Sequence, residues 1–272
     1  MRDTSIQKAL SKTPMTVTRS LLFNIAFFTW TTVCCFGLLW MLLLPRRQMV
    51  HVVEWYLRTV YFLERAILGL DYEVRGLENV PRNGSYILAA KHQSAWETMK
   101  LHLLIDDPAI ILKRELLFLP IWGWYAAKAR MIAVDRSARG RAIGSMIEGA
   151  ARVKSEGRPI VIFPQGTRTA VGRYLPYRVG VAVLYKELDL PIVPMALNSG
   201  VYWGRRSFRK RSGRVLVEFL PPIEPGLGRD AALAELETRL EAATDRLVVE
   251  AGGPPTEKPA KQVPQGAPAA VP

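Results

Sequence analysis

The feature that most constrains this chain is a long uncharged apolar run near its N-terminus. From Ser20 to Leu44 the 25 residues include no charged side chain, and arginines flank the run on both sides. A helix needs about 20 apolar residues to cross the hydrocarbon core of a bilayer. The apolar region of a cleaved signal peptide is shorter, about 7–15 residues, and small residues follow it. This run ends in Met-Leu-Leu-Leu-Pro-Arg, so we predict a membrane-anchor helix over residues 20–47.

The orientation of this helix is open, because positive charge lies on both sides of it. The N-terminal tail, residues 1–19, is basic, and two arginines follow the apolar run. Since the bias in positive charge sets which end of a spanning helix stays in the cytoplasm, a re-entrant or interfacial helix fits as well as a spanning one. Residues 48–70 predict a second helix with one polar stripe, which suits an interface. The stripe consists of His51, Glu54, Arg58, Tyr61 and Arg65.

The rest of the chain alternates short β-like runs with helical ones. Strands are predicted near Asp71–Arg75, Ser85–Ala89, Ala109–Leu112, Met131–Val134, Pro159–Phe163, Ile192–Ala196 and Arg214–Phe219. Helices are predicted near Trp96–Leu104, Ile121–Ala127, Ala138–Lys154, Val181–Glu187 and Arg229–Ala251. Such alternation predicts an α/β domain over residues 71–252, with a mixed or largely parallel sheet flanked by helices. Residues 253–272 are rich in Pro, Ala, Gly and Gln and predict a disordered tail.

The charge balance narrows the class of partner. Lys and Arg number 37 against 24 Asp and Glu, a net charge of +13. Anionic lipid, acidic protein and nucleic acid would all suit a basic chain. The sequence has no zinc-ligand spacing, helix-turn-helix signature or aromatic RNA-binding motif, so we expect no nucleic-acid partner. The cysteines Cys34 and Cys35 are adjacent in the apolar run and predict neither a metal site nor a disulfide framework.

A histidine and a carboxylate lie where the second predicted strand gives way to a helix. Glu97 follows His92 by five residues, so a turn and the first helical turn could bring its carboxylate to the imidazole. A carboxylate on one ring nitrogen fixes the tautomer and leaves the other nitrogen free to accept a proton. Ser94 is placed to cap the helix that carries Glu97. By spacing alone, a surface histidine beside a solvated helix glutamate is the alternative.

A second segment, Phe163-Pro164-Gln165-Gly166-Thr167-Arg168, follows a buried-type strand. Gly166 allows a sharp turn or a close approach to a ligand. Arg168 can present a planar fork of donors to phosphate oxygens, and Thr167 can add a hydrogen bond. An ordinary turn with a solvated arginine is the alternative.

A third segment places two cations, Lys113 and Arg114, just after a predicted strand and ahead of Pro120-Ile121-Trp122-Gly123-Trp124. Lys113 could share a phosphate with Arg168. The apolar stretch with Trp122 and Trp124 could line a groove for a hydrocarbon chain. Considered alone, two cations after a strand are typical of ordinary surface charges, which is the alternative interpretation.

In order and spacing, these segments resemble the four motif blocks of the glycerolipid acyltransferases, above all the bacterial 1-acyl-sn-glycerol-3-phosphate acyltransferases. The blocks are His92 to Glu97, then Lys113 to Leu116 with Pro120 and Gly123, then Phe163 to Arg168, and Pro191 to Pro194. The resemblance covers about residues 80–200. It implies that His92 is a general base and Glu97 its orienting carboxylate. It implies a phosphate site of Lys113, Arg114, Gly166, Thr167 and Arg168, and supporting roles for Ser94, Phe163, Pro164, Gln165 and Pro194.

Two positions depart from the family pattern. The family usually has aspartate where Glu97 stands and glutamate where Gln165 stands. Glu97 keeps the charge on a side chain that is one methylene longer. Gln165 removes a charge but keeps hydrogen-bonding capacity. This departure therefore bears more on which acceptor headgroup binds than on the acyl-transfer chemistry.

The resemblance implies acyl transfer from acyl-CoA or acyl-carrier protein to the sn-2 hydroxyl of lysophosphatidic acid, which makes phosphatidic acid. No metal or organic cofactor is expected, because a thioester is already activated. The implied location is the bacterial inner membrane, with membrane lipid as a partner and the active site on the cytoplasmic face. Another lyso-lipid acceptor, such as a lyso-ornithine lipid, is one alternative. A catalytically silent membrane-docking protein is the other.

Overall fold

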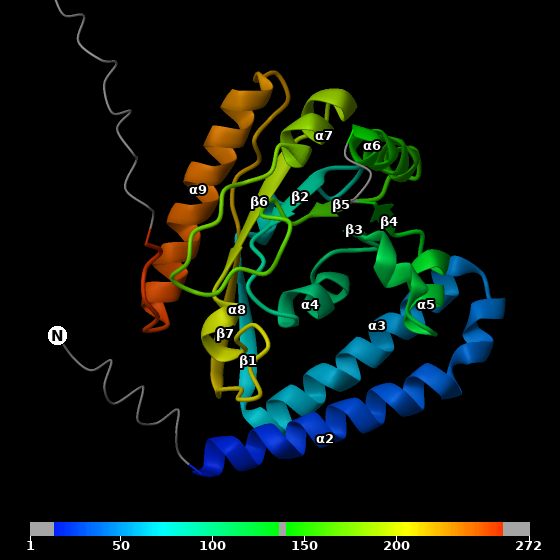
Figure 1. Cartoon of the computed structure of the whole chain (residues 1–272), viewed down its shortest axis with the longest axis vertical. Coiled ribbons are helices and arrows are strands. Elements are labelled where there is room, and N and C mark those ends of the chain that lie inside the picture. Colours follow the sequence, from blue (N-terminus) through cyan, green and yellow to red (C-terminus); the bar gives the residue numbers. More distant parts are fainter. Residues whose placement is uncertain (1–13, 136–139, 258–272) are drawn as a thin grey trace, which may run out of the picture.

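The computed structural model describes residues 14–135 and 140–257. Within these residues seven strands form one sheet in the order β1-β7-β6-β2-β5-β3-β4 (Figure 1). The strands are β1 (Leu70–Arg75), β2 (Ile87–Ala90), β3 (Ala109–Lys113), β4 (Ile132–Val134), β5 (Ile160–Ile162), β6 (Ile192–Leu197) and β7 (Gly213–Phe219). Neighbouring strands pair in parallel except β6 and β7, which are antiparallel. The predicted α/β class with a mixed, largely parallel sheet is therefore confirmed.

Helices cover both faces of the sheet. Side chains that alternate along each strand contribute to a buried cluster on each face. In β2, Ile87 and Ala89 belong to one buried cluster, whereas Leu88 and Ala90 belong to the other, as the two-residue period of a strand requires. The first cluster lies under α6 (Gly140–Ser155), α7 (Gly180–Leu188) and α9 (Arg229–Glu250). The second lies under α4 (Trp96–Leu104) and part of the N-terminal helices. Shorter elements complete the domain: η3 (Leu77–Asn79), η4 (Arg114–Phe118), α5 (Trp122–Lys128) and α8 (Ser199–Tyr202).

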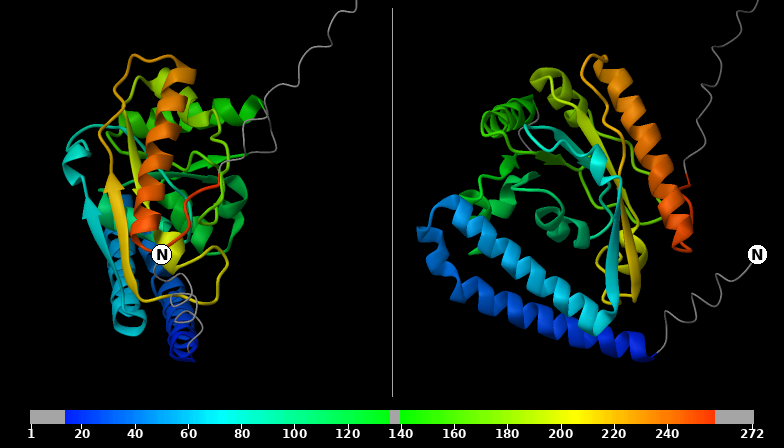
Figure 2. Two further views of the ribbon diagram at one scale, coloured as in Figure 1. Left: turned by 90° about the vertical axis from the view of Figure 1, so that its left-hand side faces the viewer. Right: turned by 180° about the vertical axis from the view of Figure 1, so that it is seen from behind.

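The N-terminal apolar run forms one helix and a short turn, and the second predicted helix follows to complete a hairpin; the first helix begins and ends earlier than the predicted 20–47. Helix α2 (Pro14–Gly37) ends at a glycine, the 3-10 turn η1 (Leu39–Leu43) follows, and α3 (Arg46–Leu63) begins after Pro45. Glycine lowers helix stability and proline cannot continue a helix, so the chain turns between them. α2 and α3 lie side by side and run in opposite directions (Figure 2). The predicted helix over 48–70 ends early, in the π-helical turn η2 (Glu64–Leu68) before β1.

The hairpin packs against the domain on one side and exposes apolar side chains on the other. Phe23 is fully buried and meets the ring of Trp203 edge-on at 5.4 Å. Leu22, Phe28 and Phe36 are each more than half exposed. In the part of the chain that the structure describes, α2 is one helix that is long and apolar enough over Thr16–Gly37 to cross a membrane.

Candidate active site

His92 and Glu97 meet just beyond the end of β2. The strand delivers the backbone to the start of α4, and Glu97 lies in the first turn of that helix. His92 Nδ1 is 2.8 Å from Glu97 Oε1. The imidazole is mostly buried, with 14% of its side chain exposed, while Glu97 is fully buried. The spacing of five residues therefore does place the carboxylate on the ring, through one turn at a strand end.

The Glu97 carboxylate is held from several directions. Besides the imidazole, Oε1 accepts hydrogen bonds from the backbone N–H groups of Gln93 at 2.8 Å and Ser94 at 2.7 Å. Oε2 accepts one from Ser199 Oγ at 2.7 Å. The Ser94 hydroxyl in turn accepts a hydrogen bond from the Trp96 N–H at 3.1 Å. The N-cap of α4 is Ala95, which has no side-chain cap, so the predicted capping serine lies one residue ahead of that position. Charge-assisted hydrogen bonds of this kind fix the position of the carboxylate.

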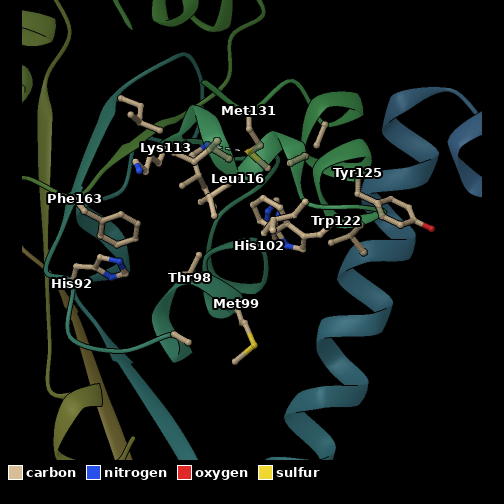
Figure 3. Close-up of a pocket in the computed structure, with 18 of the residues that line it drawn as sticks. His92, Thr98, Met99, His102, Lys113, Leu116, Trp122, Tyr125, Met131 and Phe163 are labelled. Atoms are coloured by element: carbon tan, nitrogen blue, oxygen red, sulfur yellow. Dashed lines mark hydrogen bonds between the residues drawn. The ribbon is translucent and has the colours of Figure 1, made fainter. Parts of the chain in front are cut away.

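His92 is also fixed by stacking. Its ring lies 3.9 Å from the Phe163 ring, centroid to centroid, with 20° between the planes (Figure 3). The His92 carbonyl accepts a hydrogen bond from the Thr169 N–H at 2.7 Å, which ties the histidine loop to the loop after β5. Because Glu97 occupies Nδ1, Nε2 is the ring nitrogen left to act; it has no protein hydrogen-bond partner in the described residues.

The loop after β5 presents a turn and a cation to the same cavity. Gly166 has φ +70°, which favours glycine, and its N–H donates to the Phe163 carbonyl at 2.8 Å. Gly166, Thr167 and Arg168 all line the cavity that His92 enters. Arg168 makes no ion pair within residues 14–135 and 140–257, so its guanidinium is available to an anionic ligand.

The structure separates the other two predicted phosphate ligands. Lys113 lines the cavity and pairs with Glu115 at 2.7 Å, with half of its side chain exposed. Arg114 contacts Asp135 at 3.4 Å and is not part of the cavity lining. Arg178, Arg205 and Arg206 line the cavity and were missed by the sequence analysis. The basic run at 205–211 was the available signal for the last two.

The cavity has a volume of about 1150 Å³ and is largely apolar. His92 and Tyr125 lie toward opposite ends of it, with Thr98 and His102 between them (Figure 3). Its lining comes from the N-terminal hairpin as well as the domain, for example Phe27, Leu57, Met99, Trp122 and Met131. Trp122 lines the cavity as the sequence suggested, whereas Trp124 is 53% exposed and does not. An elongated apolar cavity with a histidine at one end can hold a hydrocarbon chain.

His102 is a polar residue within this apolar lining. Burial lowers the pKa of its imidazole to about 4, so the ring is neutral at physiological pH. Its Nδ1 atom has no hydrogen-bond partner in the described residues. Nothing in its sequence context distinguishes this histidine from an ordinary core or surface residue.

Two residues of the predicted supporting set lie away from the cavity. Gln165 is 3% exposed, and its amide nitrogen lies 3.5 Å from Glu241 Oε1. Pro194 is buried in β6, in register with Ala89 of β2. The side chains of Phe163 and Pro164, in contrast, do line the cavity. Gln165 and Pro194 therefore belong to the framework behind the site.

These residues form an arrangement suited to proton abstraction beside an anionic ligand. A carboxylate-bound imidazole offers Nε2 as a base, and the Arg168 loop adds positive charge on the same cavity. The Ser-His-Asp triad uses the same orienting logic. In this site the nucleophile would have to come from the ligand, since the imidazole contacts no serine or cysteine side chain in the described residues.

Comparison with known proteins identifies the family. The acyltransferase family model matches residues 71–198. The 1-acyl-sn-glycerol-3-phosphate acyltransferase of Pseudomonas aeruginosa is 35% identical over 235 residues, which cover 86% of this chain and 90% of that protein. The enzyme of the same name from Saccharomyces cerevisiae is 30% identical over 178 residues, 64% of this chain and 58% of that protein.

The fold agrees with a solved structure. The crystal structure of the 1-acyl-sn-glycerophosphate acyltransferase of Thermotoga maritima superposes with a TM-score of 0.71 at 21% identity, covering 85% of this chain and 96% of the other. Together, the family match, the bacterial relative and the described dyad show that the chain belongs to the acyltransferase family that includes the 1-acyl-sn-glycerol-3-phosphate acyltransferases.

Proposed function

We propose that this protein transfers a fatty acyl group from an acyl thioester to the sn-2 hydroxyl of 1-acyl-sn-glycerol-3-phosphate, forming phosphatidic acid. The observation that carries the proposal is the Glu97-bound His92 at one end of an apolar cavity whose wall also holds Arg168 and Lys113. The name and 35% identity of the Pseudomonas relative support the substrate. The acyl donor is acyl-CoA or acyl-carrier protein.

His92 acts as the general base in this proposal. Nε2 takes the proton of the sn-2 hydroxyl as that oxygen attacks the thioester carbonyl, which forms the new C–O bond. The C–S bond then breaks, and the protonated imidazole returns the proton to the departing thiolate. The buried Glu97 carboxylate stabilises the imidazolium that exists between these two steps. The thioester is already activated, so the reaction needs no metal or organic cofactor.

The acceptor phosphate is held by Arg168 and Lys113. Arg168 is unpaired within the described residues and can offer two parallel hydrogen bonds to phosphate oxygens. Lys113 can exchange its exposed partner Glu115 for the phosphate, since an exposed ion pair contributes little. Gly166 and Thr167 lie on the same wall of the cavity, with the Gly166 N–H already bound to the Phe163 carbonyl. Arg114 faces Asp135 and is not part of this phosphate site.

The position of Gln165 removes the reason for favouring a different lyso-lipid. A glutamine in place of glutamate would bear on headgroup choice if its side chain faced the ligand. Gln165 instead points into the protein toward Glu241 and does not line the cavity. The phosphate-binding cations are unaffected by the departure, so a phosphate-bearing acceptor fits the site.

Membrane association follows from the N-terminal hairpin. The outer side of α2 exposes Leu22, Phe28 and Phe36. The net charge of +13 suits an anionic lipid surface. A hairpin that returns to the side from which it starts fits an interfacial or re-entrant attachment. We place the active site on the cytoplasmic face, where acyl-CoA and acyl-carrier protein are found.

The test is acyl transfer by the purified full-length protein and by its His92→Ala variant. Each is given 1-acyl-sn-glycerol-3-phosphate with acyl-CoA or with acyl-carrier protein, and phosphatidic acid is quantified. We expect wild-type turnover and a fall in kcat of about 10²–10⁴ for the variant. Activity that survives in the variant would exclude His92 as the base. Absence of product with the wild type and both donors would favour a catalytically silent docking protein.

A further inference from the structure

A buried polar cluster lies behind the site, on the α9 side of the sheet. Its members are Lys91, Gln165, Tyr177 and Glu241, all of them buried. Lys91 Nζ lies 2.5 Å from Glu241 Oε1. Tyr177 donates to the same oxygen at 2.7 Å, and the Gln165 amide nitrogen lies 3.5 Å from it. One carboxylate oxygen of α9 is therefore shared by three other segments of the chain.

Two of these segments carry the candidate active-site residues. Lys91 immediately precedes His92, and its backbone N–H donates to the Met195 carbonyl at 3.0 Å. Gln165 lies between Phe163, which stacks on His92, and Arg168. Neither Lys91 nor Glu241 lines the cavity. Glu241 thus contacts both loops from behind and touches no part of the site in which a ligand could lie.

A charge in this position is costly unless it is paired. Lys91 and Glu241 are 2% and 1% exposed, and burial lowers the pKa of Lys91 while the Glu241 carboxylate opposes that lowering. Removing one member of a buried ion pair leaves the other uncompensated. The surrounding backbone would then have to move to let water reach the lysine, and that backbone includes His92.

We propose that Glu241 is a positioning residue for catalysis, because its carboxylate on α9 holds the His92 loop through Lys91 and the Arg168 loop through Gln165. This inference rests on the proposed function for its kinetic readout. It gives α9 a part in setting the geometry of the site. This helix lies outside the residues that match the family model.

The proximity of Gln165 to Glu241 provides a charge-relocation test. Gln165→Glu combined with Glu241→Gln moves the carboxylate across a 3.5 Å contact while the net charge of the cluster stays the same. Glu241→Gln alone removes the partner of Lys91. Gln165→Glu alone places two carboxylates beside one lysine. The matched control is Glu235→Gln on the same helix, where Glu235 is exposed and pairs with Arg239 at the surface.

Acyl transfer is measured at a temperature at which thermal unfolding shows each protein to be folded. We expect Glu241→Gln to lower kcat at least about 10-fold and to raise the KM for the phosphate-bearing acceptor, since both loops lose their support. The relocated double variant should recover most of kcat, and the Glu235→Gln control should match the wild type. A stability role without positioning would lower the melting temperature and leave kcat and KM unchanged.

A substrate-free readout separates this inference from the proposed function. Mass spectrometry follows the rate at which diethyl pyrocarbonate modifies His92, which should rise several-fold in Glu241→Gln and return toward wild type in the double variant. Unchanged kinetics and an unchanged modification rate in Glu241→Gln would overturn the inference. If that single variant does not fold, the double variant decides: a folded protein with wild-type His92 reactivity supports the inference, and an unfolded one overturns it. A wild type without acyl transfer would instead contradict the proposed function.

Discussion

At the scale of single residues, the surroundings of Glu97 allow its charge to be separated from its geometry. A glutamine at this position could keep its amide oxygen on His92, Gln93 and Ser94 and turn its amide nitrogen toward the Ser199 hydroxyl. Glu97→Gln should therefore retain the orientation of His92 and lose only the stabilisation of the imidazolium. We expect kcat to fall about 10²-fold or more with little change in KM for the acceptor.

The comparison variant is Glu97→Asp, which keeps the charge on a side chain one methylene shorter. Because it keeps the charge, we expect a smaller loss of kcat than for Glu97→Gln. Some loss remains, since the shorter side chain cannot reach the imidazole and Ser199 together without movement of α4. Steady-state kinetics of phosphatidic acid formation measure both. A Glu97→Gln enzyme with wild-type kcat would show that the carboxylate charge is not used.

His102 makes a second prediction, about the pH dependence of stability. Its pKa is lowered by burial from 6.5 to about 4. Between these values the unfolded chain binds a proton that the folded chain does not, so the free energy of unfolding decreases as the pH falls through this window. Below about pH 4 the effect levels off. The contribution over the window is on the order of 3 kcal/mol.

The variant His102→Leu removes this titration. Thermal unfolding of the two proteins between pH 4 and pH 6.5 should therefore show the wild type losing stability relative to the variant as the pH falls. His51 provides the control, because its side chain is 62% exposed and His51→Leu should leave the pH dependence unchanged. A constant difference between wild type and His102→Leu across the window would contradict the prediction.

The residues that could be predicted from the sequence are those whose contacts are local. His92 and Glu97 are five positions apart, so one turn brings them together. Ser199, which holds the other oxygen of Glu97, is 102 positions away, and Glu241 is 150 positions from Lys91. Neither hydrophobic periodicity nor the spacing of motifs predicts such contacts, because they arise from the order of the strands in the sheet.

At the scale of elements, the strands were predictable because each is a short apolar run bounded by turn residues. Helix α4 has the predicted bounds, Trp96–Leu104. Two N-terminal helices were predicted, but not the end of the first at Gly37, since a 25-residue uncharged run looks continuous until Gly37 and Pro45 are weighed as interruptions. Nor does the sequence show that β1 pairs with β7, because the two strands are separated by most of the domain.

The segment between α8 and β7 leads to a prediction about membrane binding. It carries Arg205, Arg206, Arg209 and Arg211, all exposed, and Phe208, which is half exposed. Lys210 fastens the segment to α2: its Nζ donates to Asn24 Oδ1 at 2.7 Å and its N–H to Ser20 Oγ at 2.9 Å. A basic and aromatic segment fixed to the apolar helix suits the headgroup region of an anionic bilayer.

Arg209→Gln with Arg211→Gln should weaken binding to phosphatidylglycerol-containing vesicles by about 30-fold at low salt, at about 1 kcal/mol for each arginine. Binding to phosphatidylcholine vesicles should change little. Vesicle co-sedimentation measures both. The matched control, Arg82→Gln with Arg152→Gln, removes two other exposed arginines and should bind as the wild type does. Equal losses in the two double variants would show that net charge, and not this segment, sets the affinity.

At the scale of the whole molecule, the cavity is built jointly by the N-terminal hairpin and the acyltransferase domain. Phe27 and Leu57 come from α2 and α3, Met99 from α4 and Trp122 from α5. A buried ion pair joins the same parts: Lys100 Nζ of α4 lies 2.8 Å from Glu64 Oε2 at the end of the hairpin. The hairpin is thus a wall of the cavity as well as the proposed attachment to lipid, and under that proposal a chain leaving the bilayer can enter the site between the hairpin and the domain.

This joint construction makes the far end of the cavity a determinant of acyl-chain length. Tyr125 lies at the opposite end from His92 (Figure 3), and its neighbour Ala126 is buried and lines the cavity. Each methylene kept out of an apolar cavity costs about 0.8 kcal/mol. Ala126→Phe, which shortens the cavity, should lower kcat/KM for a stearoyl thioester about 10- to 100-fold relative to an octanoyl thioester. Tyr125→Ala, which lengthens it, should shift the preference toward longer chains. Trp124→Phe lies on the same helix outside the cavity and should leave the preference unchanged. Equal effects of Ala126→Phe on both thioesters would place the acyl chain elsewhere.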